Sequence, residues 1–230
     1  MQSKPELSIV IPVGPGEKAW QGLIPRFEQA SFVCQIILAG CEPPSADLEK
    51  LAAGPEIVWL DASRGRAAQV NQGVAATKSE VIWILHADSR PGPGAMKAAA
   101  EFSRRKPGTL GWFDLTYGDD PGGFTRLNAW GANWRSRLLG LPFGDQGWLM
   151  PRALFLQLGG LDEGFGRGED LDFIVRAHAE GIPLQRIGAS LETSARRYVE
   201  DGWTTTTLAH LWLTLQFWLK SRKRLRKEKS

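Results

Sequence analysis

The sequence predicts a single α/β domain built on a mostly parallel central sheet with helices on both faces. Four short apolar runs rich in β-branched residues lie between residues 7 and 85, and segments of helical composition separate them. The chain has 230 residues, of which 43% are hydrophobic and 23% charged, as in ordinary globular proteins. A chain of this length buries enough surface to fold without a disulfide or a metal. These observations exclude disordered, collagen-like and disulfide-scaffold proteins.

The first half of the chain alternates between strands and helices. Strands are expected over residues 7–13, 32–38, 57–60 and 81–85, and helices over 18–29 and 64–78. Ligands bind at the carboxyl ends of the strands in such sheets. The polar residues that follow each strand are therefore the candidates for a functional site.

The second half is less regular. Strands are expected over residues 109–117 and 144–150, and a helix over 124–139. Five glycines in the ten residues from Gly159 to Gly168 predict a mobile loop, because glycine destabilises both helix and strand. A further helix is expected from about Glu169. Residues 1–202 form the predicted domain.

Residues 203–230 are expected to form an amphipathic helix and a basic tail. The apolar side chains of one helical stripe are Leu208, Leu211, Trp212, Leu215, Trp218 and Leu219. From Lys220 onward seven residues are basic and one is acidic, whereas the rest of the chain has 21 basic and 24 acidic residues. This segment packs on the domain, on a second copy of the chain, or on a membrane surface that attracts its cations. The slight excess of acidic over basic residues in the rest of the chain argues against nucleic-acid binding.

No secretory signal or membrane span is visible in the sequence. The apolar run at residues 7–13 is short, and no segment reaches the ~18 apolar residues of a span. Cys34 and Cys41 fit neither a redox pair nor a zinc site, and we expect them to be packing residues in a reducing compartment. The sequence thus indicates a cytoplasmic protein, at the inner face of the cell membrane if the tail binds lipid.

Two polar clusters follow the third and fourth expected strands. His86 and Asp88 come directly after the fourth strand, where a carboxylate would hold Mg²⁺ or Mn²⁺ bound to phosphates, or would cap the next turn. Arg64 and Arg66 lie at a helix start, where their charge opposes the helix dipole. They are either solvated surface arginines or contacts to an anion such as phosphate.

Two further clusters lie toward the C-terminus. Glu169 and Asp170 follow the glycine-rich loop, and the helix dipole favours acids there whatever their role. A carboxylate at this point could instead act as a general base toward a hydroxyl. Arg196 and Arg197 form either surface salt bridges or contacts to a diphosphate.

Taken in order, these segments resemble the family 2 glycosyltransferases of the GT-A fold. The segments are IPV, RGRAAQVNQG, HADSRP, LPFGDQGWLMPR, GGLDEGFGRGEDLDF and SARRYVEDG. The resemblance covers about residues 7–215 and is strongest to the bacterial radical-SAM/selenodomain-associated transferases. It implies transfer of a sugar from a nucleoside-diphosphate sugar to an acceptor hydroxyl, with inversion and with a divalent cation.

The resemblance also implies roles for individual residues. Asp88 matches the metal-binding position, and His86 stands where many relatives have an aspartate. Asp170 matches the general base, with Glu169 beside it, and Gln146 would line the acceptor side. The implied donor-binding residues are Pro12, Glu17, Asp61, Arg64, Arg66, Arg196 and Arg197.

The chain departs from the family after the second strand. Relatives carry an acid there that contacts the nucleotide base, whereas this chain reads Leu38-Ala39-Gly40-Cys41, and Asp61 is the candidate substitute contact. Relatives also carry an asparagine- and acid-bearing turn after the first strand, whereas this chain reads Gly14-Pro15-Gly16-Glu17, in which Glu17 would replace the acid. Two other functions therefore stay open. One is a nucleotidyltransferase that holds a triphosphate in the turn Gly14–Lys18, although Pro15 removes a backbone donor there. The other is a catalytically silent adaptor that keeps the fold.

Overall fold

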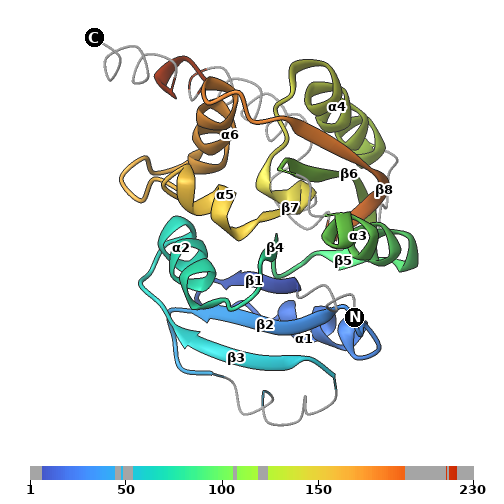
Figure 1. The fold of residues 1–230 in the computed structure, drawn as a ribbon, viewed down its shortest axis with the longest axis vertical. Coiled ribbons are helices and arrows are strands. Elements are labelled where there is room, and N and C mark those ends of the chain that lie inside the picture. Colours follow the sequence, from blue (N-terminus) through green and yellow to red (C-terminus); the bar gives the residue numbers. More distant parts are fainter. Residues whose placement is uncertain are drawn as a thin grey trace.

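The computed structural model describes residues 7–44, 48, 54–105, 108–118, 124–194, 216 and 218–221. These residues form one α/β domain around an eight-stranded sheet in the order β3-β2-β1-β4-β7-β6-β8-β5 (Figure 1). The strands are β1 Leu7–Val13, β2 Val33–Gly40, β3 Glu56–Asp61, β4 Val81–Ile84, β5 Arg90–Pro91, β6 Leu110–Gly118, β7 Trp148–Pro151 and β8 Leu184–Ser194. The helices are α1 Trp20–Leu23, α2 Arg66–Ala76, α3 Pro93–Arg105, α4 Phe124–Leu139, α5 Arg152–Gln157 and α6 Glu169–Ala179. The predicted fold class is confirmed.

The first half of the sheet is parallel. Strand β1 lies between β2 and β4, and β3 extends the sheet beyond β2, all in the same direction. Residues of β1 are almost all buried because helices cover both faces, which explains the continuous apolar run in its sequence. The four strands expected here are confirmed to within two residues at each end. Their carboxyl ends therefore meet at one edge of the sheet.

The second half of the sheet mixes directions. Strand β7 runs antiparallel to both β4 and β6, whereas β8 is parallel to β6. The two-residue β5 pairs antiparallel with β8. Strand β8 and helices α3 and α5 are elements that the sequence analysis did not identify.

Two apolar cores lie on opposite faces of the sheet. Helices α1 and α3 cover one face, and α2, α5 and α6 cover the other (Figure 1). On β1 the alternation is direct, since Ile9 and Ile11 enter the first core and Val10 enters the second. Helix α4 lies outside these layers, against β6, where the Asn133 side chain pairs with both backbone polar groups of Leu115.

Three local expectations were wrong. The helix expected over 18–29 is only the short α1 followed by a 3₁₀ turn, η1 Ile24–Phe27, in which Pro25 lacks the N–H that a longer helix needs. The strand expected over 144–150 is a 3₁₀ turn, η3 Gly144–Gln146, followed by β7. The turn expected after Asp88, with Pro91, Gly92, Pro93 and Gly94 in it, is instead the end of β5 and the start of α3, because Pro93 occupies a first helical position where proline is favoured.

The cysteines and the C-terminal segment can be compared with expectation in part. Both cysteines are free thiols, but Cys34 is exposed and so is not the packing residue that we expected. Of the predicted amphipathic helix, most residues lie outside the described ones, and so do Arg196 and Arg197. The described part packs on the domain: Trp218 lies against the core beside α6, and Ser221 is fully buried. Among the described helices, none is long and apolar enough to cross a membrane.

Candidate functional site

Four predicted site residues meet at the edge of the sheet where β4 ends. Arg66, the first residue of α2, points its guanidinium at the start of α6, with Nε 2.7 Å from Glu169 Oε1 and Nη2 3.2 Å from Asp170 Oδ2. Its Nη1 lies 3.2 Å from His86 Nε2. The positive charge of Arg66, which opposes the dipole of α2, is thus balanced by two carboxylates that lie more than a hundred residues away in sequence. We call Arg66, His86, Glu169 and Asp170 the acid–arginine cluster.

The backbone of η3 closes the cluster on one side. The Gly144 N–H donates to Asp170 Oδ2 at 3.3 Å. A Cβ atom at Gly144 would lie 3.2 Å from His86 Nε2, 3.7 Å from Arg66 Nη1 and 3.8 Å from Asp170 Oδ2. The glycine therefore allows the turn to approach three charged or polar side chains at once, which a larger residue would push apart.

The cluster keeps Asp170 ionised. Burial raises the pKa of Asp170, but the positive charge of Arg66 and the N–H groups of Gly144 and Leu171 outweigh it, so the pKa lies below the usual value. Burial also acts on Arg66, whose pKa is nevertheless raised by the charges of Asp170 and Glu169. At neutral pH the site therefore holds an ionised carboxylate beside a permanent cation.

Asp145, in the same turn as Gly144, is a candidate that the sequence analysis did not single out. Its pKa is raised, first by burial and then by the nearby charges of Asp170 and Asp88, while Arg135 and Arg66 act in the opposite direction. Its Oδ1 atom is buried without a hydrogen-bond partner in the described part of the chain. Two neighbouring carboxyl groups thus have their pKa values shifted in opposite directions, a pattern typical of groups with separate catalytic tasks.

The residues present fit a divalent cation through Asp88. Among the described residues, no three His, Cys, Asp or Glu side chains gather in a metal-binding group. Arginine can only donate hydrogen bonds, so His86 Nε2 accepts from Arg66 and its lone pair is engaged. Mg²⁺ needs only one or two protein carboxylates when phosphate oxygens and water complete its shell. Asp88, half-buried just beyond β4, could supply one.

The other predicted donor residues occupy different surroundings. Arg64 and Asp61 are exposed, and Pro12 is half-buried near the end of β1. Glu17 Oε1 accepts from the Ala19 N–H at 2.8 Å and so supports the start of α1. Among the described donor candidates, the structure brings Arg66 alone into the acid–arginine cluster.

An acid, Glu42, does follow β2, two residues beyond its last residue, Gly40. Glu42 Oε2 accepts from the Gly16 N–H at 2.9 Å and thereby joins the turn after β1 to the end of β2. Its signal in the sequence is simply that it is the first acid after the second strand. At that strand's last residue an acid would not fit, because a Cβ at Gly40 would lie 2.1 Å from the Trp59 ring.

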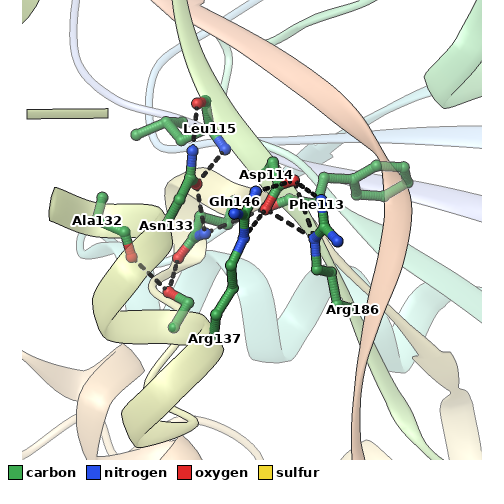
Figure 2. Close-up of polar contacts among 9 residues, drawn as sticks. Phe113, Asp114, Leu115, Ala132, Asn133, Arg137, Gln146 and Arg186 are labelled. Carbon is green, nitrogen blue, oxygen red and sulfur yellow. Dashed lines mark hydrogen bonds and ion pairs between the residues drawn. The ribbon is translucent and has the colours of Figure 1, made fainter. Parts of the chain in front are cut away.

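Gln146 lies in the interior rather than at a surface. Its Oε1 accepts from Ser136 Oγ at 2.6 Å, and its Nε2 donates to the Phe113 carbonyl at 3.1 Å (Figure 2). The same Oε1 also accepts from the Phe143 N–H at 3.1 Å. The side chain is fully buried. Gln146 therefore ties η3 to α4 and β6, and its influence on an acceptor would pass through the position of these elements.

Comparison with known proteins identifies the fold. No family model and no curated protein matches the chain. The crystal structure of S. aureus TarS 1–349 matches with a TM-score of 0.62 at 12% identity, over 82% of this chain and 60% of that one. The same protein in complex with UDP-GlcNAc matches with a TM-score of 0.61 at 13% identity, over 82% and 58%. A third structure, with UDP, gives 0.62 at 13%, over 83% and 60%.

The chain thus spans about 60% of the length of the TarS fragment. At such low identity the likeness concerns the arrangement of the strands and helices alone. The described domain of this protein has a fold of the GT-A type.

Proposed function

We propose that this protein is an inverting, metal-dependent glycosyltransferase that moves a sugar from a nucleoside-diphosphate sugar to an acceptor hydroxyl. The observation that carries the proposal is the acid–arginine cluster, which holds an ionised Asp170 at the carboxyl edge of a parallel sheet. The solved structures of TarS with UDP and with UDP-GlcNAc, which share this fold, support a nucleotide-sugar donor. The resemblance in sequence to family 2 enzymes supports the same class.

In this mechanism Asp170 is the general base. It takes the proton of the acceptor hydroxyl while that oxygen forms a bond to the anomeric carbon from the face opposite the donor diphosphate. The bond from the carbon to the diphosphate oxygen breaks, and the nucleoside diphosphate leaves with the electron pair. Attack from the opposite face inverts the configuration.

The neighbouring residues prepare this step. Arg66 keeps Asp170 ionised and fixes its direction, and Glu169 holds Arg66 in place at 2.7 Å. Asp145, with its unpartnered oxygen, would accept a hydrogen bond from a sugar or acceptor hydroxyl. Asp88 would hold the divalent cation, which supplies charge neutralisation on the diphosphate. The sequence resemblance assigns Arg64, Arg196 and Arg197 to the same donor diphosphate.

The decisive experiment compares Asp170→Asn with Glu180→Gln in a transfer assay over a panel of nucleoside-diphosphate sugars with Mg²⁺ or Mn²⁺. Asparagine cannot take the proton, so we expect transfer to fall by at least about 10²-fold, the lower range for general-base catalysis. Glu180 is an exposed carboxylate at the far end of α6, and its variant should keep full activity. Near-normal turnover by Asp170→Asn would disprove the role of the base.

The same panel tests the two other functions. A nucleotidyltransferase would release pyrophosphate from a nucleoside triphosphate, yet the Gly16 N–H that such a loop would offer already donates to Glu42. A silent adaptor would bind donors, seen as a rise in melting temperature, without transfer by the intact protein. Transfer from any donor, lost in Asp170→Asn, removes both alternatives.

We further propose a cytoplasmic location at the inner membrane face and an acceptor that is lipid-linked. The cations from Lys220 onward support this location, since each one near an anionic surface contributes about 1 kcal/mol. Activity toward acceptors in vesicles, compared with the same head group in solution, tests it.

A further inference from the structure

Helix α4 leaves a row of large apolar side chains in solvent. Leu127 is 53% exposed, Trp130 63%, Trp134 48% and Leu138 64%. Their spacing of three, four and four residues places all four on one side of the helix. We call these four residues the outer face of α4. Of the seven large hydrophobic residues that are exposed in the described part of the chain, five belong to this helix.

The opposite side of α4 is small, polar and buried. Thr125, Ala129 and Ser136 are buried there. The Ser136 hydroxyl donates to Gln146, and Asn133 pairs with the backbone of β6. The helix is thus held to the domain by its polar side, and its apolar side is turned outward. This is the reverse of the usual arrangement in a soluble protein, so the outer face needs a partner.

The charge of α4 points to the chemistry of that partner. The helix contains three arginines and no acidic residue. Arg126 and Arg137 border the outer face on the side of Trp130, at the 100° per residue of an α-helix. Arg137 Nη2 lies 2.7 Å from Asp114 Oδ2, but Arg186 binds the same carboxylate, so one acid faces two cations (Figure 2). Among the described residues of α4 and its ion pairs, a net positive charge therefore remains beside the apolar row.

We propose that the outer face of α4 docks on an anionic membrane surface. Tryptophan and leucine between arginines are the composition of helices that lie in the plane of a bilayer interface. The rings enter the boundary between head groups and acyl chains, and the arginines meet the phosphates of the head groups. A second copy of the chain fits less well, because its own α4 would present the same arginines and no acid of its own to pair with them.

The docked helix would lie directly behind the candidate site. Its inner side binds Gln146, which follows Asp145 in the chain. Gly144, two residues before Gln146 in the same turn, contacts Asp170. The membrane surface would therefore lie across the thickness of α4 from the turn that closes the acid–arginine cluster. This last step rests on the proposed function, and it places a lipid-linked acceptor hydroxyl near Asp170.

The test is sedimentation of the full-length protein with vesicles of phosphatidylcholine, with and without phosphatidylglycerol. The basic tail stays intact in every variant, so it cannot account for differences between them. We expect the intact protein to sediment with the anionic vesicles, and the double variant Trp130→Ser/Trp134→Ser to bind at least about tenfold more weakly because less apolar area enters the lipid. Leu156→Ser, which changes an exposed leucine of α5, is the matched control and should bind normally.

Three results would overturn the proposal. They are equal binding by the double variant, no binding by the intact protein, or an intact protein that is a dimer in solution and becomes a monomer in the double variant. The last result would assign the face to a second copy. The three side chains changed in the docking variants, Trp130, Trp134 and Leu156, are exposed and lie outside the acid–arginine cluster, and a normal melting temperature confirms that each variant is folded. Asp170→Asn should sediment like the intact protein, so failure of the transferase mechanism and failure of membrane docking are distinguishable.

Discussion

Replacing Arg66 by glutamine would test whether one guanidinium holds the candidate site together. The change leaves Glu169 and Asp170, whose side chains are 8% and 13% exposed, without their shared cation. Breaking a buried ion pair from one side costs about 3–5 kcal/mol. Since the Arg66 side chain is 34% exposed, water screens part of this interaction, and we expect a loss of about 2 kcal/mol at neutral pH. For a domain of this size that lowers the melting temperature by about 4–8 °C.

The loss of stability in Arg66→Gln should depend on pH in a defined direction. In the native protein the pKa of Asp170 lies below its usual value, so its pairing stabilises the fold above about pH 4 and is lost as the pH falls through the native pKa. In Arg66→Gln the charge that opposes the effect of burial on Asp170 is gone, so the pKa of Asp170 should rise. The difference in stability between the two proteins should therefore be full at pH 7 and shrink in acid.

The assay is urea unfolding of both proteins from pH 7 downward, with Arg64→Gln as control. Arg64 lies two residues away in the same segment but is exposed, so its variant should stay within about 0.5 kcal/mol of the native protein. An Arg66→Gln protein as stable as the Arg64 variant, with the same acid profile, would refute the reasoning. It would mean that the two acids are satisfied without Arg66.

Two other contacts make independent predictions. Asp114 is 8% exposed and binds both Arg137 and Arg186. Burial raises the pKa of Asp114, but the two arginines outweigh burial, so the pKa lies below its usual value. Asp114→Asn should therefore cost about 2 kcal/mol at pH 7 and weaken the loss of stability in acid, as followed by urea unfolding; an unchanged acid limb would contradict this. Ser221 Oγ donates to the buried Asp172 Oδ1 at 2.6 Å. Ser221→Ala should cost about 1–3 kcal/mol in thermal unfolding, and an unaltered melting temperature would show that the C-terminal helix is not anchored there.

The first half of the fold could be predicted because its signals are local and redundant. Strands such as β1 are buried on both faces, so nearly every residue is apolar and the run marks its own ends. The span of α4 was also predicted correctly, at residues 124–139. Its orientation was not, because the usual rule assigns the apolar side to the core, whereas here small polar residues face inward.

The second half lacked such signals. In β8 only Ile187, Leu191 and Thr193 are buried, and no apolar run distinguishes the strand from a loop. The glycine-rich segment before α6 has the composition of a mobile loop, yet contacts with distant residues hold it. Asn71 exchanges two hydrogen bonds with the Leu161 backbone, and Lys220 donates to the Phe165 carbonyl. Composition indicates the backbone freedom of such a loop, but it does not show which distant side chains form hydrogen bonds with it.

The candidate site shows where sequence reasoning reaches its limit. The rule that ligands bind at strand ends selected His86, Asp88 and Arg66 correctly as neighbours of one edge, and the helix after the glycines selected Glu169 and Asp170. Sequence reasoning could not decide whether Gln146 or Asp145 is the better candidate for a substrate contact. Both are polar, adjacent and equally plausible as substrate contacts, and a strand would have pointed them to opposite faces. The 3₁₀ turn decides instead, because it buries the Gln146 amide among protein partners and leaves an oxygen of Asp145 unpaired beside Asp170. The polar atoms of the Gln146 amide are thus bound by the protein, whereas one buried oxygen of its neighbour Asp145 has no partner among the described residues.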